Sequence, residues 1–314
     1  MTLLLRDRDV RALASFPEAV EVVARAVMSP GVAERSTMRF DHGWLRVMSG
    51  TLPSEDVLGF KAFHLVPAGV RYLISLYRLS DGEPLAMIDG NHITSMRTSA
   101  AAAAAAARFF GDQPVRVGII GSGRLARDGL RALASVCQVT AARVYSRTAA
   151  NRMSYASELG QELGIDLLPA ASPEDATSGA DHVLCATLTG GEVALKHADA
   201  GPARFISSVS STLPAQRELD EQIIAAAGLV VLDTADALDE SGDLLAAVRA
   251  GFDRNRVAML SSYLSDGPGA ADPPVVYKSI GSVEQDLALA VAVWSRAERQ
   301  GMGDRIEPVQ SRHA

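Results

Sequence analysis

Residues 115–126 read VRVGIIGSGRLA, an apolar run that meets two glycines and then an amphipathic segment. The apolar run Val115–Ile120 predicts a buried strand, and the segment after Gly123 predicts a helix. Gly121 permits a tight turn between them, and the missing side chain at Gly123 leaves room for a phosphate group. Ala126 is small enough for close packing of the helix on the strand. This order predicts a dinucleotide-binding site, because a helix N-terminus offers free N–H groups to phosphates. The alternative for the motif taken alone is an ordinary glycine turn.

The end of the next strand indicates which dinucleotide the site suits. That strand is predicted at Ala141–Tyr145, and Ser146, Arg147 and Thr148 follow it. A site for NAD(H) usually has an acidic residue here, which binds the ribose 2′-hydroxyl. An arginine between two hydroxyl side chains instead suits a 2′-phosphate. The sequence therefore predicts NADP(H) rather than NAD(H); the alternative for Arg147 is a solvated loop arginine without a ligand.

The predicted cofactor contacts come from four places in the chain. They are Gly121, Ser122, Gly123, Arg124, Leu125, Ser146, Arg147, Thr148, Ala186, Thr187, Leu188, Ser279 and Gly281. The last two precede a predicted helix, where a glycine backbone allows close approach to the nicotinamide. The alternative for this stretch is an ordinary helix N-cap at Ser279 or Ser282.

Composition narrows the class of protein. A chain of 314 residues with 48% hydrophobic and 21% charged residues is typical of a globular protein with two domains. The net charge of −7 argues against a nucleic-acid-binding surface. Two cysteines in apolar runs predict buried thiols rather than a disulfide framework. The sequence shows no signal peptide, membrane-spanning run or metal-ligand spacing, so we expect a cytoplasmic protein without a metal.

The first hundred residues predict one helix and several short antiparallel strands. Leu13–Met28 has helical spacing. Thr37–Phe40 and Trp44–Met48 flank a polar turn that contains glycine, the pattern of a hairpin. Further strands are predicted at Val57–His64, Tyr72–Tyr77 and Pro84–Ile88.

Ile93–Phe110 contains an unbroken run of alanines from Ala100 to Ala107 and predicts a helix, since alanine is the best helix former. It would also link two domains. Arg97 lies near its start, where a cation opposes the helix dipole. That position is reasonable if Arg97 and the neighbouring N–H groups bind an anion.

After Pro114 the pattern becomes an alternation of strands and helices. Strands are predicted at Val115–Ile120, Ala141–Tyr145, Asp166–Leu168, His182–Thr187, Arg204–Val209 and Leu229–Asp233. Such a series implies a doubly wound parallel sheet, which binds ligands at the carboxyl ends of its strands. A long helix, Val283–Arg299, follows, and we expect the tail past Arg305 to be disordered.

Five segments distributed over nearly the whole chain carry a resemblance to a known family. They are Met87–Ala100 (MIDGNHITSMRTSA), Gly118–Ala126 (GIIGSGRLA), Arg217–Asp220 (RELD), Glu240–Asp243 (ESGD) and Tyr277–Ala290 (YKSIGSVEQDLALA). Together and in this order they resemble the ornithine cyclodeaminase/μ-crystallin family, and most closely its μ-crystallin-like members.

This resemblance implies an α/β fold. A Rossmann-type doubly wound domain that binds NAD(P) would span residues 114–282. An N-terminal α+β domain for substrate binding and dimerisation would span residues 1–113 and be completed by the returning C-terminal helix, residues 283–314. Family members look like dimers and act on α-amino or α-imino acids, so we expect a homodimer with a small substrate of that class.

Four basic residues match substrate positions of the family. Arg97, in an MRT-like motif, corresponds to the arginine that binds the substrate carboxylate. Arg46 in LRVM and Lys61 in FKAF match a strand arginine and the substrate-site lysine; without the family match, the alternative for both is an ordinary exposed strand charge. Arg35 matches a further arginine if the hairpin here is slightly shorter. Lys61 would either hold the carboxylate or supply the proton to an imine nitrogen, and the sequence leaves both roles open.

One position departs from part of the family. Cyclodeaminases and the archaeal alanine dehydrogenases carry an aspartate in the loop where this chain has Thr212, whereas μ-crystallin has a small hydroxyl residue there. A threonine cannot serve as a general base near neutral pH. The resemblance therefore implies an NADPH-dependent reductase of ketimines or cyclic imines, with Lys61 and Thr212 as its catalytic candidates.

Two other interpretations remain open. The enzymatic alternative is an NAD-dependent amino-acid dehydrogenase or a cyclodeaminase-like enzyme, which release of ammonia from ornithine would distinguish. The alternative of another class is a non-catalytic small-ligand-binding protein gated by NADPH. The combination of Arg46, Lys61 and Arg97 disfavours it.

Overall fold

The computed structural model describes residues 1–265 and 272–307, which form two compact units. The first unit contains Met1–Arg97 and the chain from Ser282 onward, and the second contains Thr98–Gly281. The division falls inside the helix α3 (Gly90–Phe110), whereas the sequence places it at 113/114 and 282/283. The first turns of α3 pack with one unit and its alanine-rich part with the other, which helical spacing alone does not reveal.

A seven-stranded sheet with strand order β15-β1-β6-β5-β4-β3-β2 forms the first unit. Its strands are β1 (Thr2–Leu5), β2 (Ala33–Phe40), β3 (Gly43–Leu52), β4 (Val57–Val66), β5 (Gly69–Arg78), β6 (Pro84–Asp89) and β15 (Asp304–Ile306). Neighbouring strands are antiparallel, as predicted, except that β1 and β6 are parallel. The sequence does not predict β1 or β15, because three or four residues are too few to show a period of two.

Three helices accompany this sheet: α1 (Asp7–Leu13), α2 (Phe16–Met28) and α11 (Val283–Gln300). The helix predicted at Leu13–Met28 therefore begins at Phe16, while Leu13 ends α1. Ala14 and Ser15 have extended backbone between the two helices, so the apolar spacing alone runs past a real break.

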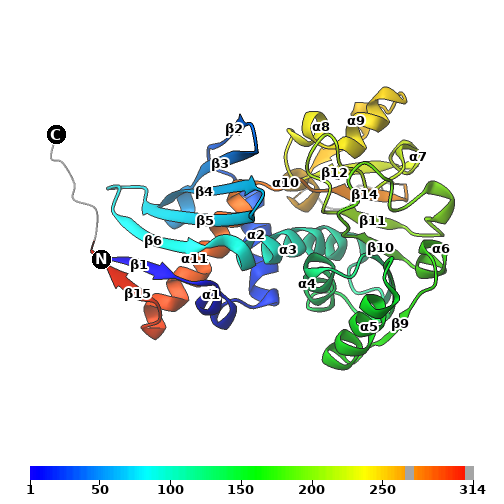
Figure 1. Ribbon diagram of the computed structural model, residues 1–314, viewed down its shortest axis with the longest axis horizontal. Helices are drawn as coiled ribbons and strands as arrows, with labels where there is room; N and C mark the ends of the chain where they lie inside the picture. The colour runs from blue at the N-terminus through cyan, green and yellow to red at the C-terminus, as the bar shows by residue number, and fades with distance from the viewer. Residues whose placement is uncertain (266–271, 308–314) are drawn as a thin grey trace. The chain divides into compact units, whose positions relative to one another are not determined.

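Helix α11 lies against one face of the sheet, over β3, β4 and β5 (Figure 1). Glycines make this close approach possible. A Cβ at Gly50 would lie 2.6 Å from Val283, and one at Gly59 would lie 2.8 Å from Leu287. Gly50 and Gly59 are paired across β3 and β4, so they leave a gap on the sheet surface into which the start of α11 packs.

The second unit is an eight-stranded, wholly parallel sheet with strand order β13-β12-β14-β11-β10-β7-β8-β9. Its strands are β7 (Val115–Ile120), β8 (Val139–Tyr145), β9 (Asp166–Pro169), β10 (His182–Cys185), β11 (Phe205–Ser208), β12 (Leu229–Leu232), β13 (Val257–Met259) and β14 (Val275–Lys278). The predicted parallel sheet is confirmed. Strands β13 and β14 are not predicted, and β14 lies between β11 and β12.

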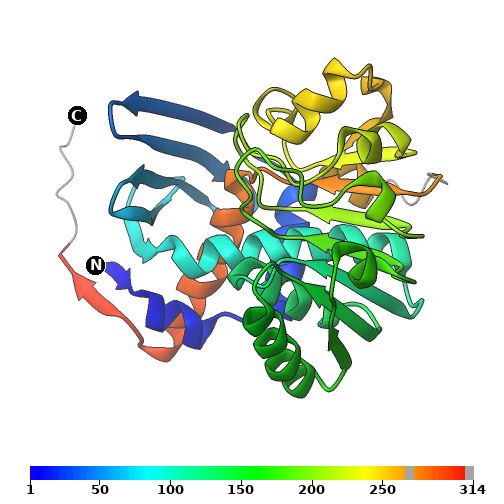
Figure 2. The same ribbon diagram turned by 45° about the vertical axis from the view of Figure 1, so that its right-hand side comes forward.

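Helices cover both faces of this sheet, as a doubly wound fold requires (Figure 2). They are α4 (Arg124–Ala134), α5 (Ala149–Leu163), α6 (Pro173–Thr177), α7 (Glu221–Ala226), α8 (Ala237–Glu240), α9 (Gly242–Arg249) and α10 (Leu260–Ser265). Gly118 faces α6, where a Cβ would lie 2.7 Å from the Ala176 carbonyl oxygen. Gly129 of α4 packs instead on Leu184, which faces the other side of the sheet because it pairs with Ile119.

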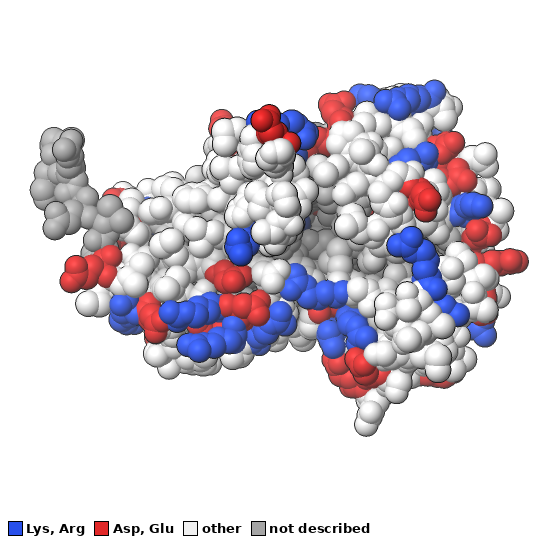
Figure 3. All heavy atoms as spheres, in the orientation of Figure 1, with Lys and Arg blue, Asp and Glu red and all other residues white. Residues whose placement is uncertain are grey.

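The surface and the cysteines show ordinary features. Figure 3 shows basic and acidic side chains interspersed on the face in view. Cys137 and Cys185 are free and buried, as the sequence predicts. Within residues 1–265 and 272–307, no helix is both long and apolar enough to cross a membrane. The disorder predicted past Arg305 is wrong for Ile306, which belongs to β15, and residues 308–314 lie outside the described residues.

Candidate functional site

Three of the four predicted substrate residues lie on the sheet face that α11 covers. Arg35 pairs with Met48, and Met48 pairs with Lys61, so these residues form one row across β2, β3 and β4. Arg46 belongs to the same face, because it lies two residues before Met48 on β3. Side chains paired directly across antiparallel strands share a face. The strand register thus gathers Arg35, Arg46 and Lys61 without any loop.

The fourth residue, Arg97, reaches this group through a carboxylate on α11. Lys61 Nζ donates to Asp286 Oδ1 at 2.9 Å, and Arg97 Nε donates to the same oxygen at 3.0 Å. Arg97 Nη1 also donates to Gln285 Oε1 at 3.0 Å. Lys61, Asp286 and Gln285 are at most 1% exposed, and Arg97 is 5% exposed. We call Lys61, Arg97 and Asp286 the Asp286 cluster.

Charge is not balanced within the Asp286 cluster. Two cations share one carboxylate, so the cluster has a charge of +1 when Lys61 is protonated. Burial lowers the pKa of Lys61 from 10.5 to about 8; the charge of Asp286 opposes this shift, while Arg97 and Arg35 add to it. The Lys61 ammonium is therefore the main form at neutral pH. Its Nζ also lies 5.1 Å from the ring centroids of both Phe63 and Tyr72.

Arg46 is held in a fixed orientation on the same sheet face as Lys61. Its Nε donates to Thr37 Oγ1 at 2.8 Å, and its guanidinium lies 5.9 Å from the Trp44 ring centroid. Only 6% of Arg46 is exposed. An arginine ordered in this way is ready to bind a planar carboxylate through two N–H groups.

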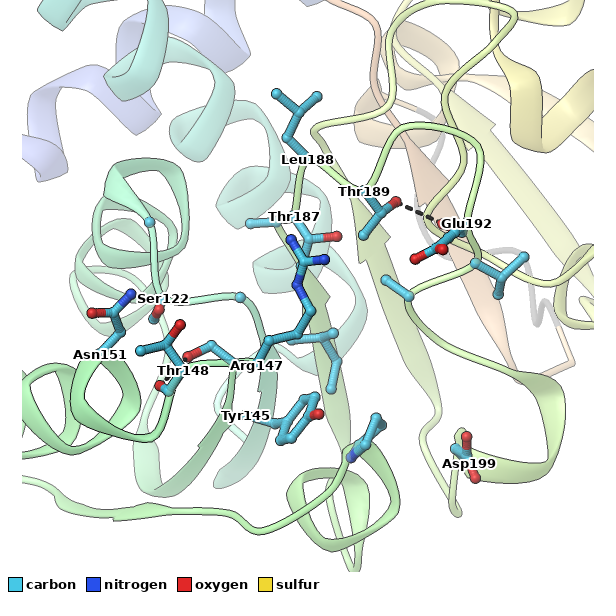
Figure 4. A pocket seen from close by; sticks show the side chains of 18 of the residues that line it. Ser122, Tyr145, Arg147, Thr148, Asn151, Thr187, Leu188, Thr189, Glu192 and Asp199 are labelled. Carbon is cyan, nitrogen blue, oxygen red and sulfur yellow. Dashed lines mark hydrogen bonds between the residues drawn. The ribbon is translucent and has the colours of Figure 1, made fainter.

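The second unit contains a cleft of about 540 Å³ at the carboxyl ends of its strands. Nine of the predicted cofactor residues line it: Gly121, Ser122, Gly123, Ser146, Arg147, Thr148, Ala186, Thr187 and Leu188. Arg124 and Leu125 form the first turn of α4, directly after Gly123. Figure 4 shows the Arg147 side chain reaching into the cleft from the loop after β8.

The glycine turn has the geometry that a dinucleotide requires. Gly121 has φ of +120°, and a Cβ there would lie 2.3 Å from the Ala186 carbonyl oxygen, so only glycine fits. A Cβ at Gly123 would meet nothing within 4 Å, which leaves open space in front of the N-terminus of α4. Ala126 is fully buried, and its carbonyl oxygen accepts a hydrogen bond from the Tyr155 hydroxyl at 2.8 Å. The turn therefore fits the pyrophosphate of a dinucleotide.

The side chains near Arg147 suit an anion. Ser146, Thr148 and Asn151 line the same part of the cleft. Among the described lining residues only Glu192 and Asp199 are acidic, and Figure 4 shows both on the other side of the cleft from Asn151 and Thr148.

Glu218 is a fully buried carboxylate beneath these loops. It accepts hydrogen bonds from the backbone N–H groups of Thr187 (2.7 Å), Ser210 (2.9 Å) and Ser211 (3.3 Å) and from Ser208 Oγ (2.7 Å). Thr212 follows directly and is half-buried; its N–H donates to Gln216 Oε1 at 3.0 Å. Glu218 thus joins the Thr212 loop to the cleft loop that starts at Ala186.

Lys278 and Asp243 complete a buried ion cluster with Glu218. Lys278 Nζ lies 2.9 Å from Asp243 Oδ2 and 3.9 Å from Glu218 Oε2, and all three residues are 0% exposed. Burial raises the pKa of Glu218, and Lys278 only partly opposes it. At Asp243 burial is outweighed by Lys278 and by hydrogen bonds, so the pKa of that carboxyl is lowered.

Ser279 and Gly281 are fixed by the carboxylate of Asp233. Ser279 Oγ donates to it at 2.6 Å, and the Gly281 N–H donates at 2.8 Å. Of the two serines considered for the helix N-cap, Ser282 occupies the N-cap of α11, so this alternative is wrong for Ser279 and confirmed for Ser282. Among the described residues, neither Ser279 nor Gly281 lines the cleft, and no cluster of metal-binding side chains is present.

Among the described residues, four charged side chains that are 0% exposed have no role in the sequence-based prediction: Glu218, Asp243, Lys278 and Asp286. Each lies in a segment that carries the family resemblance. A charged residue within an apolar run, such as Lys278 after Val275–Tyr277, indicates a buried charge that needs a partner. The signal was therefore present, but it does not name the partner, because Lys61 and Asp286 lie 225 positions apart.

Comparisons with known proteins find similarity along nearly the whole chain. The profile of the Ornithine cyclodeaminase/mu-crystallin family matches residues 7–301. A Delta(1)-pyrroline-2-carboxylate reductase of Bacillus cereus is 28% identical, with 97% of this chain and 99% of the relative covered. The ketimine reductase mu-crystallin of Rattus norvegicus is 29% identical, with 80% of each chain covered. The solved structure of Thermococcus litoralis Delta(1)-pyrroline-2-carboxylate reductase, in complex with NADH and L-proline, matches with a TM-score of 0.89 at 28% identity, covering 97% of this chain and 100% of that chain.

Proposed function

The chain belongs to the ornithine cyclodeaminase/mu-crystallin family, and we propose that it is an NADPH-dependent reductase of a small α-imino acid. The predicted resemblance is confirmed. An NAD(P)-dependent oxidoreductase that acts on carbon–nitrogen bonds agrees with the reductases among its relatives. We further propose that the cofactor is NADPH rather than NADH, and we assign roles to individual residues.

The observation that carries the proposal is the charge of the Asp286 cluster. Buried cations in excess of their carboxylate partners are costly unless an anion joins them. An α-imino acid brings one carboxylate, which would neutralise the charge of +1. We assign Arg97, Arg46 and Arg35 to the binding of that carboxylate, with Arg46 and Arg97 fixed by their hydrogen bonds to neighbouring side chains.

The reaction needs few groups besides these. The bound cofactor supplies the hydride that reaches the imine carbon. The glycine turn fits the pyrophosphate, because Gly123 faces open space at the start of α4. Thr212 would donate a hydrogen bond near the imine nitrogen, and Lys61 is the candidate for the proton.

Arg147 is the reason to prefer NADPH. It lies in the cleft next to Ser146 and Thr148, with no carboxylate in the position that a ribose 2′-hydroxyl uses. The Thermococcus litoralis relative was solved with NADH, so the preference is a separate question from the reaction.

Steady-state kinetics test the proposed function. The protein should oxidise NADPH in the presence of Delta(1)-pyrroline-2-carboxylate or its six-membered analogue, and it should release no ammonia from ornithine. Arg254→Ala is a suitable control, because that arginine is exposed and lies away from the cleft lining. Cofactor binding without turnover on any imine would favour the non-catalytic binding protein, and ammonia from ornithine would favour a cyclodeaminase.

We propose further that the protein is a homodimer formed through the first unit. The edge strand β2 offers unpaired backbone groups, and apolar side chains on this sheet are exposed: Met38 by 60%, Phe40 by 45% and Leu73 by 37%. All three lie on the face turned away from α11, because along the strands they alternate with the residues that share the face of Arg35 and Lys61. A second copy of this chain would cover them.

A further inference from the structure

The Asp286 carboxylate has a position that substrate binding alone does not explain. A negative charge inside a carboxylate-binding site weakens the binding of an anion. Asp286 nevertheless lies fully buried between two of the cations, and its Oδ1 accepts from both Lys61 and Arg97. Its Oδ2 is buried and has no hydrogen-bond partner among the residues that the structure describes.

The two cations also differ in what they can do. An arginine stays protonated at any relevant pH, whereas a buried lysine can lose its proton. Lys61 is held on three sides: by Asp286, by the ring of Phe63 and by the ring of Tyr72. Asp286 occupies the first turn of α11, which packs onto the glycine pair of β3 and β4, so its place relative to Lys61 is set by the sheet.

We infer that Asp286 is a positioning residue for proton transfer: it holds Lys61 as an oriented ammonium that protonates the imine nitrogen, while the arginines bind the carboxylate. This inference rests on the proposed function and assigns the role of Lys61 that the sequence leaves open. The carbon–nitrogen π bond breaks as hydride bonds to carbon, and its electron pair takes a proton from Lys61 Nζ. Lys61 is left as a neutral amine, still hydrogen-bonded to Asp286, and regains a proton from solvent.

The charged and titratable groups that face Lys61 come from several elements. Asp286 of α11 raises its pKa, while Arg97 of α3 and Arg35 of β2 lower it. Arg46 of β3 lies on the same face, and the Tyr72 phenol of β5 belongs to one of the two rings. With the Lys61 pKa near 8, the rate of imine reduction should fall above about pH 8 as the donor proton is lost.

The chain allows a direct test, because it has only three lysines: Lys61, Lys196 and Lys278. Lysine labelled isotopically at Cε should give three NMR signals, with exposed Lys196 as the internal reference. In Asp286→Asn, the Lys61 titration should move down by roughly 1–3 pH units, since the opposite charge is lost. The decline of kcat at high pH should move with it. Asp286→Glu should restore both toward the unmodified values, and Asp41→Asn, in an exposed turn, should change neither.

Lys61→Arg separates proton transfer from charge. The arginine keeps a cation for the substrate carboxylate but cannot release a proton, so kcat should fall by roughly 10²–10⁴-fold while KM for the imino acid changes little. A Lys61 titration unmoved in Asp286→Asn, a loss of kcat that is uniform with pH, or an active Lys61→Arg variant would each overturn the inference. An unmodified protein that reduces no imine would instead overturn the proposed function, and the NMR titration would still report on the Asp286–Lys61 coupling.

Discussion

At the scale of single residues, two buried cations share one carboxylate, and the proposed substrate carboxylate would bind beside them. Arg97→Ala should lower kcat/KM for the imino acid by roughly 30- to 4,000-fold, because losing one partner of a buried charged contact costs about 2–5 kcal/mol. Arg97→Lys should recover only part of this loss, since it lacks the two-pronged geometry. Kinetics on the two variants, with circular dichroism to verify folding, provide the measurement. Unchanged turnover in Arg97→Ala would contradict the assignment.

Thr212 is an uncharged candidate residue, and its substitution can be compared with that of the charged Arg97. Thr212→Ala removes only an uncharged hydrogen bond, so kcat should fall by less than about tenfold. Steady-state rates for this variant, taken beside those of Arg97→Ala, make the comparison. A loss as large as that of Arg97→Ala would mean that the Thr212 loop has a greater share in the chemistry than a hydroxyl explains.

The proposed contact of Arg147 with a 2′-phosphate rests on its neighbours in the cleft, Ser146 and Thr148. Arg147→Ala should weaken NADPH binding by about 1.5–3 kcal/mol, the usual value of a hydrogen bond to a charged group, and leave NADH binding almost unchanged. Fluorescence titration of both cofactors tests this, with Arg254→Ala as the control. Equal losses for the two cofactors would show that Arg147 does not contact a 2′-phosphate.

At the scale of elements, the two glycines of the strand–turn–helix motif should have different roles: Gly121 in stability and Gly123 in cofactor binding. Gly121→Ala should destabilise the protein by about 1–3 kcal/mol, because its φ is +120° and its Cβ would collide with the Ala186 carbonyl. Gly123→Ala should leave stability within about 0.5 kcal/mol but weaken cofactor binding, since the open space before α4 would be filled. Denaturant unfolding without cofactor, followed by cofactor titration, distinguishes the two effects. Equal stability losses would contradict this division.

The Glu218 carboxylate holds the loops that follow β10 and β11 through hydrogen bonds. Glu218→Gln would place an amide NH₂ among donors that need an acceptor, which should cost about 1–3 kcal/mol of stability. Cofactor binding should weaken as well, because the Thr187 N–H loses its partner beside the cleft. Unfolding curves and cofactor titrations of this variant make the test; a Glu218→Gln protein of unchanged stability would show that the loops are held elsewhere.

At the scale of the whole molecule, the proposed dimer can be tested with two methionines of equal exposure. Met38 on β2 and Met153 on α5 are both 60% exposed. Met38→Asp should give a monomer, because a charge would be buried in an apolar interface, and Met153→Asp should not change the assembly. Sedimentation or light scattering over a range of protein concentrations gives the masses. A monomeric unmodified protein, or a dimer that survives Met38→Asp, would argue against this interface.

Local features were predictable from the sequence because their causes are local. The glycine turn after Val115–Ile120 is set by steric limits on a few adjacent residues, and the alanine run of α3 by helix propensity. The same holds for the β2–β3 hairpin, whose turn and alternation lie within twenty residues. These features, together with the five family-like segments, were enough for the doubly wound fold, the family and the type of reaction.

Only the tertiary structure decided which distant charges meet. Asp286 reaches Lys61 because α11 returns to the glycine pair on β3 and β4, and Lys278 reaches Glu218 because β14 inserts between β11 and β12. A sequence can show that a buried charge needs a partner, since desolvation makes an isolated one too costly. It cannot show which partner, because that depends on how segments distant from one another in the sequence pack together.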